Sequence, residues 1–241
     1  MENKVSTGSA DLNEWLNGGY EKDVVTMIAG CPGSGKTNFC ILATCSMAKK
    51  GKKVIFVDSE GGFSVERVKQ IVGAEYTSIL ENIMLLSPVD FFEQKKDFEK
   101  ISKYANNDIG LVVIDSMAMH YRLMLGEASS IKDDYKIQDI NREVSRQMKI
   151  LVEISRKKAI PILVTNQVYN QFVKMDEFKN GFEKETNIVG GDLLQYWSKC
   201  IIELKKDGSR RKAILLKHRN LSDREFNFVI RNEGIFKSGW F

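Results

Sequence analysis

Apolar runs without polar interruption alternate with longer amphipathic stretches along the first two thirds of the chain. The runs occupy residues 24–28, 54–58, 83–86, 111–115 and 162–165. Strands that are apolar on both faces are typical of a parallel sheet covered by helices on each side. The pattern therefore predicts an α/β fold whose mainly parallel, twisted sheet is flanked by helices.

Two amphipathic stretches between these runs predict helices. Residues 38–50 and 134–157 both carry apolar side chains at three- and four-residue intervals, which is the spacing of one helical face. Gly51 directly follows the first stretch, as expected of a residue that tolerates a positive φ at a helix end. The longer helix lies between the last two predicted strands.

The pattern changes towards the end of the chain. Residues 200–204 and 212–216 predict two strands joined by a turn at 207–209, and residues 226–230 predict a third strand. Short runs separated by turn residues are typical of antiparallel hairpins. We therefore expect an antiparallel C-terminal extension over residues 200–241.

The bulk composition fits one globular domain over residues 1–241, with a lead-in segment at 1–20. The chain has 241 residues, of which 43% are hydrophobic and 28% are charged, as is ordinary for a soluble domain. No run of about 18 apolar residues exists, so no membrane span is expected, and the start lacks the pattern of a signal peptide. The four cysteines form no CxxC pair and predict reduced thiols in a cytoplasmic protein. The formal net charge of +4 is too small to indicate nucleic-acid binding by itself.

A glycine-rich octapeptide follows the first predicted strand and opens the first predicted helix. Its sequence is Gly30-Cys31-Pro32-Gly33-Ser34-Gly35-Lys36-Thr37. This is a full match to the P-loop pattern, in which backbone N–H groups surround phosphate oxygens at the positive end of a helix. Lys36 would stabilise charge on the β- and γ-phosphates as a catalytic residue, and the Thr37 hydroxyl would hold Mg²⁺. Together with Asn38, the octapeptide is the predicted ATP-binding loop, and ATP and Mg²⁺ are the predicted cofactors.

Three more polar residues follow predicted strands. Asp115 would accept a hydrogen bond from magnesium-bound water, although an aspartate at a strand end also serves as a helix cap. Glu60 would orient and deprotonate the water that attacks the γ-phosphate, or it is a solvated loop residue. Gln167 would touch the γ-phosphate and report its loss, or it caps a turn. With the P-loop, these residues predict in-line hydrolysis of ATP.

These motifs, in this order, resemble those of the RecA/RadA recombinase family. Besides the P-loop, the matching segments are Val57-Asp58-Ser59-Glu60-Gly61, Val112-Val113-Ile114-Asp115-Ser116 and Val164-Thr165-Asn166-Gln167-Val168. Residues 6–19 resemble the lead-in to the family's first core strand. The resemblance covers most of the chain and implies a RecA-like P-loop NTPase core. It also implies Glu60 as the hydrolytic base, Gln167 as the γ-phosphate sensor, and DNA-binding loops after Asp115 and Gln167.

Within the family, the chain most resembles the short archaeal paralogue of RadA. Residues 217–220 are similar to the Lys-His-Arg segment near the end of that paralogue. The chain begins directly with the core, and no Phe-x-x-Ala-type linker motif is found. Residues 185–192 keep the paired glycines of recombinases but lack the prolines that cap a neighbour's ATP. The resemblance implies weak ATP hydrolysis and an accessory role beside RadA rather than filament formation.

Three segments are candidates for DNA contact. Residues 168–189 predict a loop of near-neutral charge whose aromatic side chains could stack on bases or meet a protein instead. Those side chains are Tyr169, Phe172, Phe178 and Phe182. Residues 117–132 are the loop that the resemblance implies after Asp115, and in it Arg122 would contact phosphate or form a surface salt bridge. Residues 205–224 hold eight basic and two acidic residues, a density that favours phosphate binding over protection of a sheet edge.

The basic segment contributes Arg210, Arg211, Lys217 and Arg219 to the predicted DNA-binding or trans-acting set, beside Arg122. Lys217 and Arg219 flank His218, so both could point the same way from an extended strand. By resemblance to RecA-fold ATPases with a basic finger there, they could instead reach the γ-phosphate of a neighbouring copy. Hydrolysis would then depend on self-association.

The resulting prediction is an ATP-binding, DNA-associated accessory protein of homologous recombination and DNA repair, with weak Mg-dependent ATPase activity. Its expected partners are single-stranded or branched DNA, a RadA-type recombinase, other recombination proteins, and a second copy of the chain as a homo-oligomer. Two alternatives stay open. One is a protein-binding mediator that ATP switches without hydrolysis, and the other is a KaiC-like regulatory ATPase or autokinase.

Overall fold

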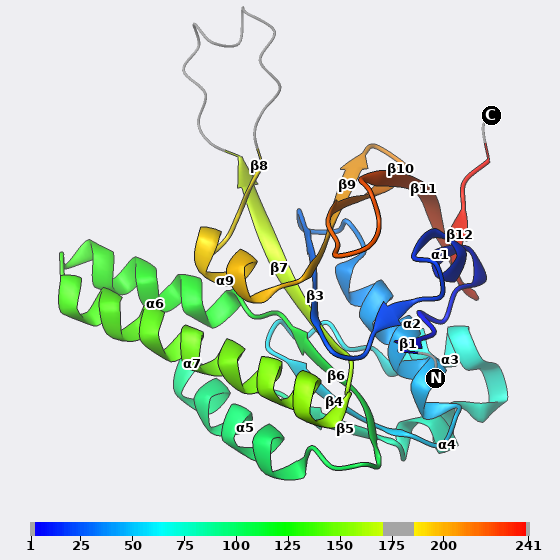
Figure 1. Ribbon diagram of the computed structural model, residues 1–241, viewed down its shortest axis with the longest axis horizontal. Coiled ribbons are helices and arrows are strands. Elements are labelled where there is room, and N and C mark those ends of the chain that lie inside the picture. The colour runs from blue at the N-terminus through cyan, green and yellow to red at the C-terminus, as the bar shows by residue number, and fades with distance from the viewer. Residues whose placement is uncertain (1–2, 171–185, 240–241) are drawn as a thin grey trace, which may run out of the picture.

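A mixed sheet runs through the whole molecule (Figure 1). The computed structural model describes residues 3–170 and 186–239. In these residues the sheet has ten strands, in the order β12-β11-β10-β9-β3-β7-β6-β4-β5, with β8 paired to β7 off this path. The predicted α/β fold with a mainly parallel sheet and antiparallel C-terminal strands is confirmed.

The parallel part of the sheet contains all five predicted apolar runs. Its strands are β3 (Val25–Gly30), β4 (Lys53–Asp58), β5 (Ile83–Leu86), β6 (Ile109–Asp115) and β7 (Ile162–Asn170). Of these, β7 extends furthest beyond its predicted run, because Val168 to Asn170 pair with the short antiparallel strand β8 (Thr186–Ile188). The carboxyl ends of β3, β4, β6 and β7 therefore meet at one edge of the sheet, which is where the predicted site residues follow.

The C-terminal strands extend the sheet on the other side of β3. They are β9 (Cys200–Asp207), β10 (Arg210–Lys217), β11 (Arg224–Arg231) and β12 (Gly234–Lys237). β9 pairs in parallel with β3, and β10, β11 and β12 follow antiparallel to one another. The predicted hairpin is thus joined directly to the strand that carries the P-loop.

The lead-in segment packs beside these last strands. It contains β1 (Lys4–Val5), the helix α1 (Ala10–Trp15) and β2 (Tyr20–Glu21), with β1 and β2 forming a separate two-stranded sheet. The Ser9 side chain caps α1 and also donates a hydrogen bond to the Ile235 carbonyl at 2.6 Å. The two ends of the chain are therefore tied together.

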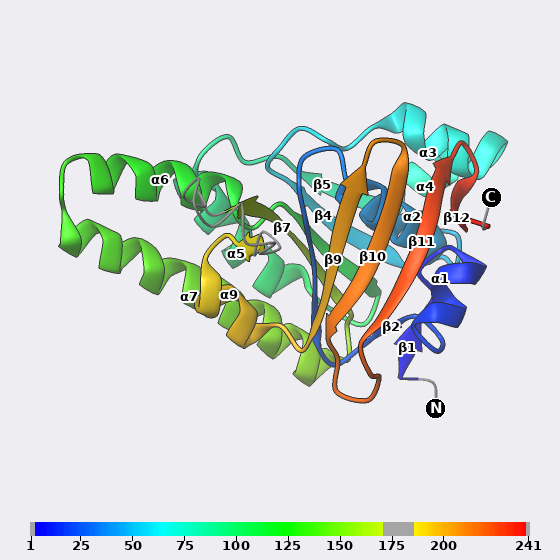
Figure 2. The ribbon, with the colours of Figure 1, turned by 90° about the horizontal axis from the view of Figure 1, so that it is seen from above.

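Helices cover both faces of the sheet (Figures 1 and 2). One face carries α1, α2 (Lys36–Ala48), α3 (Val65–Val72), the short turn η1 (Gly73–Glu75) and α4 (Tyr76–Leu80). The other carries α5 (Phe91–Tyr104), α6 (Met119–Ser130), α7 (Asp134–Lys158) and α9 (Gly191–Trp197). Two buried apolar clusters result, one on each face. Both helices predicted from the apolar spacing are present, as α2 and α7.

The segment after β6 corrects one prediction. Residues 117–132 were predicted to form a loop, but most of them form α6, which packs along α7. Tyr121 and Ala128 are buried against α7, and the Tyr121 hydroxyl donates to Asn141 Oδ1 at 2.9 Å. The seven-residue spacing of these two buried side chains places both on one face of a helix. Their packing on α7 explains why this segment is helical although many of its residues are polar.

The second predicted loop lies mostly outside the described residues. Its ends, 168–170 and 186–188, are paired as β7 and β8. Phe172, Phe178 and Phe182 lie outside the described residues, whereas Tyr169 is exposed on β7.

Candidate functional site

The glycine-rich loop connects β3 to α2 at the carboxyl edge of the sheet. Gly35 has a φ of 114° and forms the N-cap of α2, a conformation that disfavours any residue with a Cβ. A Cβ on Gly30 would lie 2.6 Å from the Leu204 carbonyl oxygen of β9. These glycines allow the loop to turn tightly against the sheet, with the first N–H groups of α2 at its centre.

Lys36 is held across the mouth of this loop. Its ammonium group donates to the Gly30 carbonyl at 2.9 Å and to the Cys31 carbonyl at 3.1 Å, and the residue is only 7% exposed. Burial lowers the pKa of Lys36, while the nearby carboxylates of Glu60 and Asp115 oppose that shift. A bound phosphate would oppose it further, because an adjacent anion favours the charged ammonium.

Asp115 ends β6 with one carboxylate oxygen satisfied and the other not. Its Oδ1 accepts a hydrogen bond from the Thr165 hydroxyl, whereas Oδ2 is buried and has no hydrogen-bond partner among the described residues. Burial raises the pKa of Asp115, and the neighbouring Thr165 and Thr37 hydroxyls oppose this shift. A Cβ placed on Gly62 would lie 3.3 Å from Thr37 Oγ1 and 3.9 Å from Asp115 Oδ2. The hydroxyl and the unpartnered carboxylate oxygen therefore face the same space, which suits the oxygen ligands preferred by Mg²⁺.

Glu60 lies in a turn that the Asp58 side chain stabilises. The Asp58 carboxylate accepts hydrogen bonds from the backbone N–H groups of Gly62 and Phe63, both at 2.9 Å. β4 and β6 are neighbours with Asp58 opposite Asp115. The turn therefore places Glu60 at the same edge of the sheet as the P-loop and the Asp115 carboxylate.

Glu60 is bonded to two further residues of this edge. Its Oε1 accepts hydrogen bonds from the Ser116 hydroxyl and, at 3.0 Å, from Gln167 Nε2. The Gln167 amide oxygen in turn accepts from Arg122 Nη1 at 2.5 Å. Gln167 lies opposite Gly30 in the β3–β7 pairing. A continuous polar chain thus runs from Ser116 through Glu60 and Gln167 to Arg122, directly beside the P-loop.

Two of these positions were missed from the sequence. Ser116 and Thr165 lie within the segments that resemble the family motifs, but neither was assigned a role. The available signal was a hydroxyl at a strand end beside a residue predicted to hold the metal. Arg122 was predicted to contact DNA phosphate or to form a surface salt bridge; in the structure its guanidinium donates to Gln167, and the DNA contact stays a prediction.

The other predicted basic residues fall into two groups. Arg210 and Arg211 begin β10, on the side of the molecule that carries the P-loop. Lys217 and Arg219 lie at the opposite end of that strand, where they line a surface pocket of about 340 Å³ with Arg156, Lys199 and His218. The predicted DNA-binding or trans-acting set is therefore split between two distant places, and its role remains a prediction.

Lys217 and Arg219 both have partners within the chain. Lys217 Nζ donates to the Gln195 carbonyl at 3.0 Å. The Arg219 guanidinium bonds Glu21 at 2.9 Å and both oxygens of Asp23 at 2.6 and 2.8 Å, and these carboxylates raise the pKa of Arg219. Arg219 thereby fixes the lead-in segment to the end of the hairpin.

The part of the chain described here contains no helix that combines the length and apolar character needed to cross a bilayer. The four cysteines are free thiols, and three of them are buried.

Comparison with known proteins shows what the chain is similar to. The Rad51 family model matches residues 3–238. The DNA repair and recombination protein RadB of Methanobrevibacter smithii is 37% identical over 238 residues, covering 96% of this chain and 95% of the relative. RadB of Methanococcus maripaludis strain C7 is 41% identical over 225 residues, covering 93% and 96%. A crystal structure of the RadB recombinase superposes with a TM-score of 0.77 at 32% identity, covering 97% of this chain and 99% of that one.

Proposed function

The chain belongs to the Rad51 family, and from this premise we propose that it serves DNA repair and recombination as an ATP-binding accessory protein. The resemblance predicted from the motifs is confirmed by the RadB relatives, and so is the role in repair and recombination. The continuous sheet supports reading residues 1–241 as one domain. The buried free thiols support a cytoplasmic location.

One observation carries the nucleotide proposal: the unpartnered Asp115 Oδ2 faces Thr37 beside the P-loop. A buried carboxylate oxygen without a hydrogen bond is costly, and a magnesium ion or its bound water would satisfy it. We assign Thr37 as a direct ligand of Mg²⁺ and Asp115 as a ligand through water. When bound, the ion neutralises charge on the phosphates.

Residues of the chain itself bind the phosphates and activate the attacking water. The loop N–H groups and Lys36 hold the phosphates, and the Lys36 ammonium has a third N–H donor beyond the two that bond the Gly30 and Cys31 carbonyls. Glu60 takes the proton of the attacking water. Its Oε1 already accepts hydrogen bonds from Ser116 and Gln167, so this oxygen is occupied before a water molecule can approach it. We therefore infer that turnover is slow while Gln167 holds Glu60.

This arrangement also bears on the alternative of a mediator that ATP switches without hydrolysis. Gln167 bridges Glu60 and Arg122, so a γ-phosphate contact that moves the Gln167 amide would change both of these hydrogen bonds. Such a change would reach α6 and β8 whether or not the phosphate is cleaved. Hydrolysis and switching are thus separable in this site, and both serve an accessory role beside a RadA-type recombinase.

DNA contact is proposed for the exposed basic end of the β9–β10 hairpin. Arg210 is exposed there, next to the turn at 208–209, whereas Arg122, Lys217 and Arg219 are bound within the chain. Single-stranded or branched DNA is the expected partner, since the phosphate backbone supplies most sequence-independent affinity.

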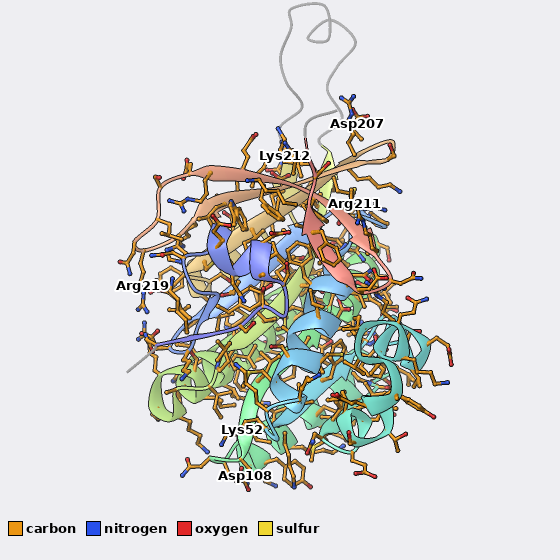
Figure 3. All side chains as sticks on the ribbon, turned by 90° about the vertical axis from the view of Figure 1, so that its right-hand side faces the viewer. Lys52, Asp108, Asp207, Arg211, Lys212 and Arg219 are labelled. Carbon is orange, nitrogen blue, oxygen red and sulfur yellow. The ribbon has the colours of Figure 1, made fainter. Side chains whose placement is uncertain are left out.

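Titration of the full chain with ATP, in Mg²⁺ or in EDTA, tests the nucleotide proposal. Lys36→Ala should lower ATP affinity about tenfold or more, because it removes the charge beside the phosphates. Asp115→Asn should lower affinity in Mg²⁺ and change it little in EDTA. Lys52→Ala, which removes a lysine at the far edge of the sheet (Figure 3), is the control. Failure of the unmodified protein to bind ATP would overturn the proposal.

A further inference from the structure

The two faces of the β9–β10 hairpin place basic side chains in different surroundings. Lys206 and Arg211 lie directly opposite each other in the antiparallel register, two rows beyond Leu204 and Ala213. Arg211 is also opposite Phe228 of β11. Leu204, Ala213 and Phe228 belong to the buried cluster beneath α2. Because side chains alternate along a strand, Lys206 and Arg211 lie on this same face, which is the P-loop face.

The neighbouring row, on the opposite face, consists of Lys205 and Lys212. Each of these has a carboxylate partner: Lys205 pairs with Glu203 at 3.7 Å, and Lys212 pairs with Glu225 at 2.7 Å. Like charges directly opposite on a sheet are destabilising. On this face the protein offsets the repulsion with its own carboxylates.

Lys206 and Arg211 have no such compensation. Within residues 3–170 and 186–239, no carboxylate oxygen lies within 4.0 Å of either charged group. The Arg211 Nε atom is buried and has no hydrogen-bond partner among the described residues. Two opposed cations, one with an unsatisfied donor, are unfavourable in the free protein. An anion bound at this row would remove both penalties.

The row lies against the phosphate-binding loop. A Cβ placed on Gly33, in the middle of the loop, would be 3.7 Å from Lys206 Nζ. β9 runs parallel to β3 with Leu204 opposite Gly30. Lys206, the next residue of β9 on the same face, therefore lies beside the loop. Arg211, labelled in Figure 3, lies at the start of the adjacent strand β10.

We propose that Lys206 and Arg211 bind the phosphate groups of a nucleotide held in the P-loop of the same chain. This inference rests on the proposed ATP binding and extends it to a second cationic element, supplied by β9 and β10. Phosphate oxygens lie about 3 Å from the loop N–H groups that bind them. The long, flexible side chain of Lys206 ends beside Gly33 of this loop, and the planar guanidinium of Arg211 supplies paired donors for phosphate.

ATP titration of matched variants tests this inference, with thermal unfolding as a check on the fold. Lys206→Ala and Arg211→Ala should each weaken ATP binding about three- to tenfold, and Lys206→Arg should restore most of the affinity because it keeps the charge. Lys205→Ala and Lys212→Ala, which alter the same strands on the opposite face, should change ATP affinity less than about twofold. Without nucleotide, removing either opposed cation should leave the melting temperature equal or higher.

The outcomes distinguish this inference from the proposed function. If ATP binds and Lys36→Ala weakens binding, but Lys206→Ala and Arg211→Ala do not, the inference is wrong and the nucleotide site stands. If the two variants lose affinity for single-stranded DNA while keeping ATP affinity, the row belongs to a DNA surface and the inference is again wrong. If the unmodified protein binds no ATP, both fail together.

Discussion

Gln167 Nε2 donates a hydrogen bond to Glu60 Oε1 at 3.0 Å, so the residue expected to sense the γ-phosphate holds the residue expected to activate water. The two are 107 positions apart in sequence and meet because β7 and the turn after β4 end at the same edge of the sheet. The predicted sensor and the predicted base are therefore in direct contact in this structure. Any movement of Gln167 changes the hydrogen bonding of Glu60, which connects the conformation of β7 to the chemistry.

Replacing Glu60 with glutamine should abolish turnover without abolishing nucleotide binding. The amide keeps the acceptor oxygen that faces Ser116 and Gln167 but cannot take a proton from water, so kcat should fall about 100-fold or more. Phosphate release and ATP titration on the same sample would separate the two effects. Glu66→Gln, on the exposed side of α3, is the matched control. Unchanged phosphate release would remove Glu60 from the catalytic role, and unchanged stimulation of a recombinase would favour the mediator.

Arg122→Ala should raise the intrinsic rate of ATP hydrolysis several-fold. Loss of the 2.5 Å bond from Arg122 to the Gln167 amide frees Gln167 to leave Glu60 Oε1, and that oxygen can then accept a hydrogen bond from the attacking water. One hydrogen bond corresponds to about 1 kcal/mol, which limits the change to about fivefold. Steady-state ATPase rates would show it, with Arg142→Ala as the control because Arg142 only pairs with Asp139 on the surface. A lower rate would mean that Arg122 positions Gln167 for hydrolysis.

Arg219→Ala should destabilise the fold by about 1–3 kcal/mol, because it leaves the buried Glu21 carboxylate without its main partner. The side chains of Arg219 and Asp23 are each more than one third exposed, so solvent screening reduces the contribution of their ion pair to the free energy of unfolding. Urea unfolding would measure the loss. The expected result leaves ATP affinity unchanged. Unaltered stability together with lost ATPase activity would instead support the trans-acting role predicted for Arg219.

Acid should destabilise the protein through His218. The imidazole Nδ1 accepts hydrogen bonds from the backbone N–H groups of Asn220 and Leu221 at 3.1 and 3.2 Å, which requires the neutral ring. Burial lowers the pKa of His218 from its ordinary value of 6.5, although Glu21 opposes the shift. The unfolded state therefore binds the proton more readily, so the His218 contribution to stability is complete above about pH 6.5 and decreases as the pH falls below it.

His218→Asn isolates this contribution, since an amide oxygen can accept the same backbone bonds without titrating. Unfolding free energies measured at pH 5.5 and 7.5 should differ less for the variant than for the unmodified chain. An equal pH dependence in both proteins would show that the carboxylates, and not His218, control acid sensitivity.

Local pattern predicted the central features of the fold. The apolar runs that became β3, β4, β5, β6 and β7 are continuous in sequence, and the P-loop glycines are required by the turn they make. α6 was missed because the resemblance to the recombinase family implied a DNA-binding loop after Asp115. The helical spacing of Tyr121 and Ala128, which packs the segment on α7, was given too little weight.

Contacts between distant segments could not be predicted in this way. The Arg122–Gln167 bond and the Arg219–Glu21 bond join residues 45 and 198 positions apart, and nothing in either local sequence specifies the partner. The different surroundings of Lys205 and Lys206 could not be predicted either. Which face of the sheet each lysine lies on depends on the register of β9.

The pairing of β9 with β3 also has a consequence for how the protein is made. Residues 30–37 leave the ribosome early. The strands that pack against this loop, from Leu204 to Ile230, are among the last parts to be synthesised. Chains fold from the N-terminus as they emerge, so a nascent chain halted before residue 200 carries every P-loop atom and still lacks one side of the nucleotide site. Tight ATP binding would then mark completion of synthesis, and nucleotide would stabilise only chains whose last strands have joined the sheet.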